Sequence, residues 1–266
     1  MTALVLVSPA TAEPIARAEA KAHLRVDSTD DDVLIDALIA AARGQVEAMT
    51  GRALVLQRFK LQLDAFPATI RLPRAPAVAI DSIVYIDAAG VSQTLAASGY
   101  AADLASQPAR VAPAYGEVWP ETRDQMNAVS VTFRAGHATP FTSDATSDIV
   151  TATDHPFANA DRLRLTTAGG TIPTGLAALA DYFARDVSGN TLKLAATSGG
   201  AAIDITAAGT GLNFLGEIPG PARSAMLLLI GAWYEHREQI IAGTIVSEIQ
   251  GPAAVERLLW PLRLFW

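Results

Sequence analysis

The 266-residue chain contains no cysteine, 6% aromatic residues and only four histidines, His23, His137, His155 and His236. The absence of cysteine excludes thiol catalysis, thiolate zinc sites and disulfide frameworks. No two histidines stand at metal-ligand spacing, and no P-loop, dinucleotide fingerprint or G-x-S-x-G elbow occurs. The sequence therefore predicts a protein that is not an enzyme and that uses no metal or other cofactor.

The chain also lacks a basic character and any long hydrophobic run. It has 20 Lys and Arg against 27 Asp and Glu, a net charge of −7, whereas a nucleic-acid clamp needs a positive surface. The longest apolar run, residues 225–234, is far shorter than the ~20 residues of a membrane span. Residues 1–7 lack the basic start of a signal peptide. We therefore expect a soluble protein without a membrane partner.

What is present suffices for one or two folded domains. Half of the residues are hydrophobic, which excludes a mainly disordered chain. In residues 30–50, apolar side chains such as Ile35, Ile39 and Val46 recur at helical spacing and predict a helix. Other helices are expected at about 16–24, at 222–241 and at 253–259.

Four acidic residues, Asp30, Asp31, Asp32 and Asp36, mark the start of the helix predicted at 30–50. Carboxylates are stabilised at the positive end of a helix dipole, and Thr29 or Asp30 can cap the first turn. A capped helix start therefore explains the three consecutive aspartates, and a metal site is the alternative interpretation.

Alternation of apolar and polar residues then replaces the helical period. Strands are predicted at 59–63, 70–72, 80–86, 91–95 and 129–133. Residues 138–216 carry short β runs separated by glycine-rich turns, with strands predicted at 149–151, 162–166, 182–185, 191–194 and 203–206.

The predicted fold class is α+β. Residues 1–137 and 217–266 form one discontinuous domain, in which the two long helices make the core. Residues 138–216 form an inserted small all-β domain, either a barrel or a sandwich.

The C-terminal segment is unusual because it is apolar and aromatic, whereas termini are normally polar. It must either fold onto its own core or dock on a partner, and large aromatics with arginine are typical of protein interfaces. The candidate docking residues are Leu259, Trp260, Leu262, Arg263, Leu264, Phe265 and Trp266.

An ordered series of segments resembles the head–tail connector (adaptor) family of long-tailed bacteriophages. The resemblance covers about residues 13–137 and 217–266. Its segments are residues 18–25, 32–43, 46–47, 50–54, 113–116, 119–120, 129–133, 135–136, 227–229 and 233–238. The middle region departs from this pattern and is similar to a small β module of phage tail and connector proteins.

The resemblance implies a structural subunit of the virion neck. Such subunits form a homo-oligomeric ring, usually dodecameric, between the portal protein and the stopper or tail-terminator protein, and extend the DNA channel. The family's C-terminal segment reaches toward the portal, a role that would fall here on residues 253–266.

A neutral or acidic lining would let DNA slide, because it releases no counterions from the phosphates. Asp30, Asp31, Asp32 and Asp36 are therefore candidates for a channel-facing or subunit-facing surface, with a solvated helix start as the alternative.

Two other functions remain open. The β domain at 138–216 could recognise a glycan or a host surface, because it contains several aromatic residues, namely Phe141, Phe157, Tyr182, Phe183 and Phe214. A hydrolase acting on cell wall or DNA is the third hypothesis.

Overall fold

The computed structural model describes residues 2–236 and 253–264. The chain divides into two compact units. The first unit comprises the described residues within 1–11, 51–137 and 264–266, and the second unit those within 12–50 and 138–263. The two units therefore alternate along the sequence.

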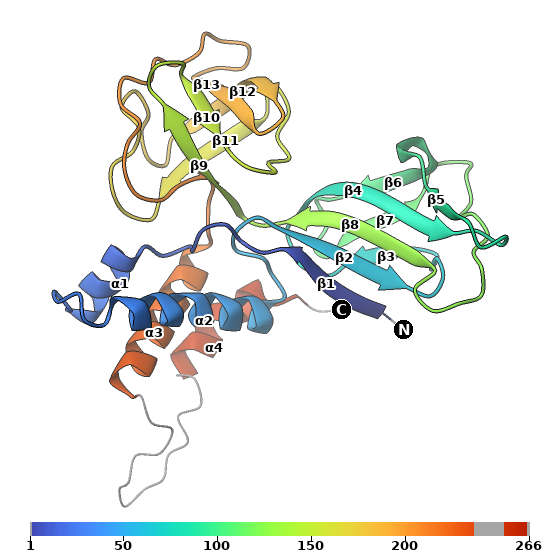
Figure 1. The fold of residues 1–266 in the computed structure, drawn as a ribbon, viewed down its shortest axis with the longest axis horizontal. Helices are drawn as coiled ribbons and strands as arrows, with labels where there is room; N and C mark the ends of the chain where they lie inside the picture. The colour runs from blue at the N-terminus through green and yellow to red at the C-terminus, as the bar shows by residue number, and fades with distance from the viewer. Residues whose placement is uncertain (1, 237–252, 265–266) are drawn as a thin grey trace, which may run out of the picture. The chain divides into compact units, whose positions relative to one another are not determined.

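The first unit consists of two antiparallel sheets (Figure 1). The larger sheet has the order β1 (Thr2–Ser8), β2 (Gln57–Leu63), β8 (Val129–Ala135), β4 (Ala77–Ile86), β5 (Ser92–Thr94). The smaller sheet has the order β3 (Ile70–Leu72), β7 (Ala109–Pro113), β6 (Tyr100–Asp103). A short 3-10 helix, η1 (Ala97–Gly99), precedes β6.

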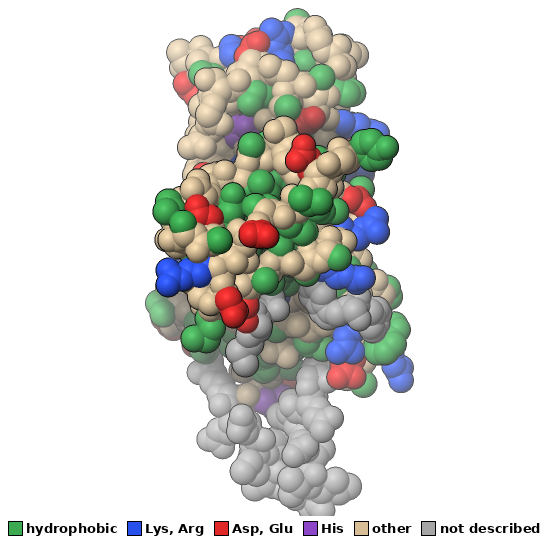
Figure 2. All heavy atoms as spheres, turned by 90° about the vertical axis from the view of Figure 1, so that its right-hand side faces the viewer, with side chains coloured by type: hydrophobic (Ala, Val, Ile, Leu, Met, Phe, Trp, Pro, Cys, Tyr) green, Lys and Arg blue, Asp and Glu red, His purple; other side chains and the backbone are tan. Residues whose placement is uncertain are grey.

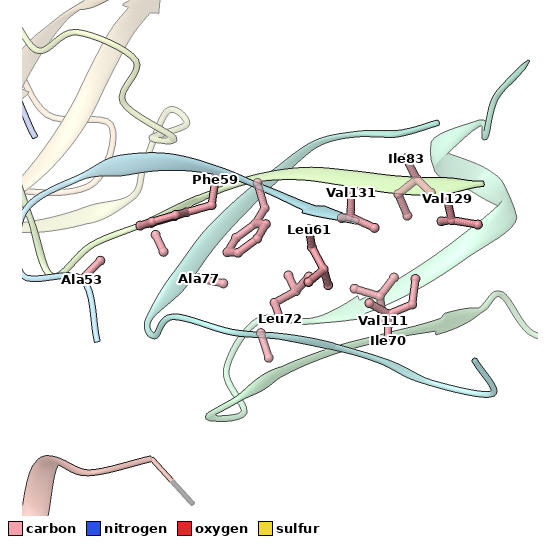
Figure 3. Close-up of a cluster of buried hydrophobic side chains, with 13 residues drawn as sticks. Ala53, Phe59, Leu61, Ile70, Leu72, Ala77, Ile83, Val111, Val129 and Val131 are labelled. Carbon is pink, nitrogen blue, oxygen red and sulfur yellow. The ribbon is translucent and has the colours of Figure 1, made fainter. Parts of the chain in front are cut away.

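Both sheets contribute to one hydrophobic core (Figure 3). Leu61 of β2 lies opposite Val131 of β8, and both side chains are buried. Ile70 and Val111, paired in the smaller sheet, belong to the same cluster. Burial alternates along β8, as the alternation in its sequence requires, because successive strand side chains point to opposite faces. The apolar faces of the two sheets therefore pack against each other.

The predicted strands of this unit all occur, but three others were not predicted. β1, β6 and β7 lack a clear alternating signal at the sequence level. The prediction that two long helices make the core of the discontinuous domain is not confirmed, because residues 51–137 have a core of their own between two sheets.

The helices of the second unit are α1 (Arg17–Leu24), α2 (Asp32–Thr50), α3 (Gly220–Glu235) and α4 (Ala253–Leu259), followed by the 3-10 turn η2 (Trp260–Leu262). α2 packs against α3, and α3 against α4. α2 buries Ile35, Ile39 and Val46, the stripe that the helical spacing predicts. The helix predicted at 222–241 is described as far as Glu235, and residues 237–241 lie outside the described residues.

The remaining part of the second unit is a closed six-stranded barrel (Figure 1). Its order is β10 (Ile149–Thr151), β13 (Thr191–Ala195), β12 (Asp181–Ser188), β11 (Arg162–Thr167), β14 (Asn213–Gly216), β9 (Ala138–Asp144). The sequence left a barrel and a sandwich open for this region, and the structure shows a barrel. Whether it is an insertion into a domain made of residues 1–137 and 217–266 stays a prediction.

One predicted barrel strand is wrong. Residues 203–206 form no strand, although Ile205 is fully buried and its backbone N–H donates to Asp148 Oδ1 at 2.9 Å. β9 and β14, which were not predicted, pair with each other and close the barrel. In the described part of the chain, no helix is long and apolar enough to cross a membrane.

Candidate interaction surfaces

The C-terminal segment begins inside the protein's own core. Val255 and Leu259 on α4 are 1% and 0% exposed, and α4 contacts both α3 and α2. We therefore no longer count Leu259 among the candidate docking residues, because no part of its side chain is accessible to a partner. The apolar residues of α4 therefore pack within this chain.

Within the described part of the segment, Trp260 and Arg263 are the exposed candidate docking residues. Trp260 is 58% exposed, and the guanidinium carbon of Arg263 lies 5.5 Å from the centroid of the Trp260 indole ring. A cation at this distance from an aromatic face is attracted to its electrons. Arg263 is exposed and Leu262 is half-buried. The pair thus presents an aromatic and cationic surface, the combination that dominates many protein interfaces.

The remaining members of the segment differ from one another. Leu264 is half-buried, and a Cβ placed on Gly51 would lie 3.4 Å from its Cδ1. Gly51, which follows the last residue of α2, has a φ of +74°, the left-handed conformation in which many helices end. Leu264 therefore packs against the backbone at this helix end. Phe265 and Trp266 lie outside the described residues.

Three of the four candidate acidic residues are engaged within the chain. Asp32 accepts hydrogen bonds from Lys21 Nζ at 2.7 Å and from Arg17 at 3.1 Å. Asp36 accepts from Arg17 Nε at 2.7 Å and from a second guanidinium nitrogen. Asp31 accepts from the hydroxyl of Tyr234. Asp30 is exposed.

The pairing changes the electrostatics of the helix start. The hydrogen bond from Lys21, followed by the charges of Lys21 and Arg17, holds the pKa of Asp32 below its usual 3.8. The hydrogen bond to Asp36 raises the pKa of Arg17. The positive charges of α1 therefore balance the negative charges of Asp32 and Asp36.

The sequence contains a signal for these two basic partners. Arg17 and Lys21 stand four residues apart on one predicted helix, and Asp32 and Asp36 stand four residues apart on the next. Side chains at this spacing share a helix face, so two such faces of opposite charge can pair. Among the described residues, no cluster of three or more His, Asp or Glu could hold a metal ion.

A second exposed surface, in the loop between β7 and β8, was not predicted. Tyr115, Val118 and Met126 are among the most exposed hydrophobic side chains in the described part of the chain. Figure 2 shows the right-hand side of Figure 1, where hydrophobic side chains are interspersed with acidic and basic ones. Trp119 of the same loop stacks on Phe66, with ring centroids 4.7 Å apart.

The candidate aromatic residues of the barrel are buried or half-buried. Phe141, Tyr182 and Phe214 are 6%, 7% and 1% exposed. Phe157 and Phe183 are half-buried, and Phe157 stacks on His155 at 5.2 Å. A glycan platform needs aromatic faces that are open to solvent, so these side chains do not favour that function.

Comparison with known proteins supports the resemblance seen in the sequence. Residues 18–97 match the family of phage gp6-like head-tail connector proteins. The matched range contains all of α1 except Arg17, α2 and the strands β2 to β5, and it excludes the C-terminal segment. The resemblance to head–tail connector proteins is therefore confirmed over these residues. No curated protein matches the chain.

Solved structures share the fold over almost the whole length. A chain from the neck of an empty gene transfer agent (GTA) particle, computed with C6 symmetry, has a TM-score of 0.55 and 21% identity. The alignment covers 100% of this chain and 96% of that chain. A chain from the virion of the native GTA particle gives 0.54 and 19%, covering 99% and 96%. A chain from the native GTA neck, computed with C12 symmetry, gives 0.52 and 21%, covering 100% and 96%.

Proposed function

We propose that the chain is a structural head–tail connector subunit of a virion neck. The match of residues 18–97 to connector proteins carries the proposal. The alignments to chains from particle necks also cover 100% of this chain, which supports extending the proposal to the barrel. The function is mechanical, and we assign no enzymatic step to any residue.

The proposed assembly is a ring of identical subunits, dodecameric as in the family that the sequence resembles. The neck structures were computed with sixfold and twelvefold symmetry, which supports cyclic repetition of the similar chains. In the proposed position, the ring lies between the portal protein and the stopper or tail-terminator protein. Contacts in such a ring are heterologous, with one face of each subunit meeting a different face of the next.

We propose that the C-terminal segment docks on the portal through Trp260 and Arg263, together with Leu262, Leu264, Phe265 and Trp266. Trp260 is large, exposed and adjacent to an arginine, and it follows directly on a helix whose Leu259 is anchored in the fold. An anchored helix holds the exposed pair in position and lowers the entropy lost on binding. A ring would repeat the contact in every subunit and gain avidity.

We propose that DNA passes through the ring without being held. The net charge of −7 disfavours phosphate binding. Because Arg17 and Lys21 balance Asp32 and Asp36, Asp30 is the strongest remaining candidate for an acidic surface toward the channel or a neighbouring subunit.

Two measurements test the proposal. Imaging of particles assembled with a labelled chain should place the label at the neck, and a label found elsewhere in the particle would contradict the proposal. Separately, a chain lacking residues 260–266 should fold, as judged by circular dichroism and thermal unfolding, yet fail to bind the portal ring. If the truncated chain bound the portal as well as the full chain does, the proposal that the C-terminal segment docks on the portal would be wrong.

A further inference from the structure

The edge strand β1 has an unusual sequence for a sheet edge. It pairs with β2 on one side, with Leu4 opposite Leu61 and Leu6 opposite Phe59. These partners belong to the core, so Leu4 and Leu6 lie on the core side of the sheet. Val5, opposite Lys60, lies on the other side. β1, the dark blue edge strand of Figure 1, therefore carries apolar side chains on both faces, which is typical of strands covered on both sides.

The strand is also accessible. Val5, Leu6 and Val7 are 45%, 50% and 46% exposed. Proteins commonly protect an edge strand with charge, proline or brevity. β1 has seven residues, with neither charge nor proline. Among the described strands, none pairs with its outer edge. An edge of this kind is a template for strand addition.

The opposite edge of the same sheet has a different character. β5 has three residues, Ser92, Gln93 and Thr94, all of which are exposed. Neither β5 nor β1 contains a charged side chain. Two copies of a chain with a net charge of −7 repel each other, and these uncharged edges are places where they can meet with little repulsion.

We propose that β1 is the docking site for a second copy of this chain, whose β5 edge adds to it and continues the sheet from subunit to subunit. One long apolar edge and one short polar edge on a single sheet make a heterologous contact, and repetition of a heterologous contact gives a ring when the rotation between copies closes. The inference rests on the proposed ring, and it assigns the subunit contact to two named strands.

The absence of cysteine makes a direct test possible. We would prepare the double variant Val5→Cys with Thr94→Cys, which carries one thiol on each edge. Cα atoms on adjacent strands lie about 4.5–5.5 Å apart, a separation that disulfides span. A short bismaleimide cross-linker accommodates a shift in register. The matched control is Val5→Cys with Val118→Cys, because Val118 lies in the same unit and is 82% exposed.

The expected result is a ladder of covalent multimers in assembled particles for the Val5 and Thr94 pair, with only background for the control pair. If the chain is present in the neck and the Val5 and Thr94 pair links no better than the control, the inference is overturned while the proposed function stands.

If the chain is absent from the neck, the proposed function fails. Cross-linking of the concentrated purified chain then tests whether β1 of one copy contacts β5 of another. A ladder there supports the contact, and its absence overturns it.

A second set of variants gives an independent measurement. Val5→Lys and Val7→Lys place charge on β1, whereas Val118→Lys adds the same charge elsewhere in the unit. We expect at least a tenfold loss of multimer formation for the β1 variants alone, measured by sedimentation at equal protein concentration. Thermal unfolding of each variant separates a lost contact from a lost fold, and equal association of all three variants contradicts the proposal.

Discussion

The hydroxyl of Tyr234, near the end of α3, donates a hydrogen bond of 2.5 Å to the carboxylate of Asp31, just before α2. The two residues are 203 positions apart in the sequence. This contact joins the ends of two helices that pack against each other, and it gives one of the candidate acidic residues a structural role.

Substitution Tyr234→Phe should lower the free energy of unfolding by about 1–2 kcal/mol, because a hydrogen bond to a charged group is lost while the ring remains. Denaturant unfolding followed by circular dichroism measures the change. The matched control is Tyr115→Phe, which removes a hydroxyl from a fully exposed side chain and should leave the stability unchanged. Equal effects of the two substitutions would show that the Asp31 contact contributes nothing.

His137 should make stability depend on pH. Burial, followed by the nearby charge of Arg52, lowers the pKa of His137 from 6.5 to about 4. Its Nε2 is buried and has no hydrogen-bond partner in the described structure. The folded state therefore binds a proton less readily than the unfolded state. The stabilising effect is complete above pH 6.5 and is lost as the pH falls toward 4, by about 3 kcal/mol in total.

The variant His137→Gln should have a flatter stability profile between pH 6.5 and 4, since it cannot titrate there. His236→Gln is the control, because His236 is exposed at the end of α3. Unfolding midpoints are measured across this pH range. If the His137 variant lost stability with falling pH as steeply as the unchanged chain, the attribution of the pH dependence to His137 would be wrong.

Leu259 and Trp260, although adjacent, should respond in opposite ways. Leu259→Ala removes a fully buried side chain and should cost about 3 kcal/mol of stability. Trp260→Ala removes a side chain that is 58% exposed and should change stability by only about 0.5 kcal/mol. Under the proposed function, Trp260→Ala should also weaken portal binding at least tenfold in a pull-down titration. Normal portal binding by a folded Trp260 variant would exclude this residue as an anchor.

Two glycines should also differ in their response to substitution by alanine. A Cβ on Gly136 would lie 2.5 Å from the backbone of Leu56, so Gly136→Ala should destabilise the chain by about 3 kcal/mol. Gly44 is exposed within α2, and a Cβ there meets nothing within 4 Å. Gly44→Ala should raise stability by about 0.5–1 kcal/mol, because alanine favours the helix. Melting temperatures that move in the same direction for both variants would refute the steric explanation.

The elements that could be predicted are those with a local period. Ile35, Ile39 and Val46 recur at helical spacing, and Phe59, Leu61 and Leu63 alternate, so α2 and β2 follow from neighbouring residues alone. The barrel was predicted from its turns and short β runs, but not which strands close it. β9 and β14 become strands through pairing with each other across the barrel, and residues 203–206 do not.

The candidate sites, too, could be predicted only as far as they depend on neighbouring residues. The sequence determined that this chain has no thiol chemistry, a net negative charge, an aromatic C-terminal segment and aspartates at a helix start. Only the tertiary structure decided that Leu259 is buried, that Arg17 and Lys21 pair with Asp36 and Asp32, and that β1 lies at a sheet edge. Composition and period are properties of neighbouring residues, whereas burial, ion pairing and edge position depend on segments that the fold brings together from distant parts of the chain.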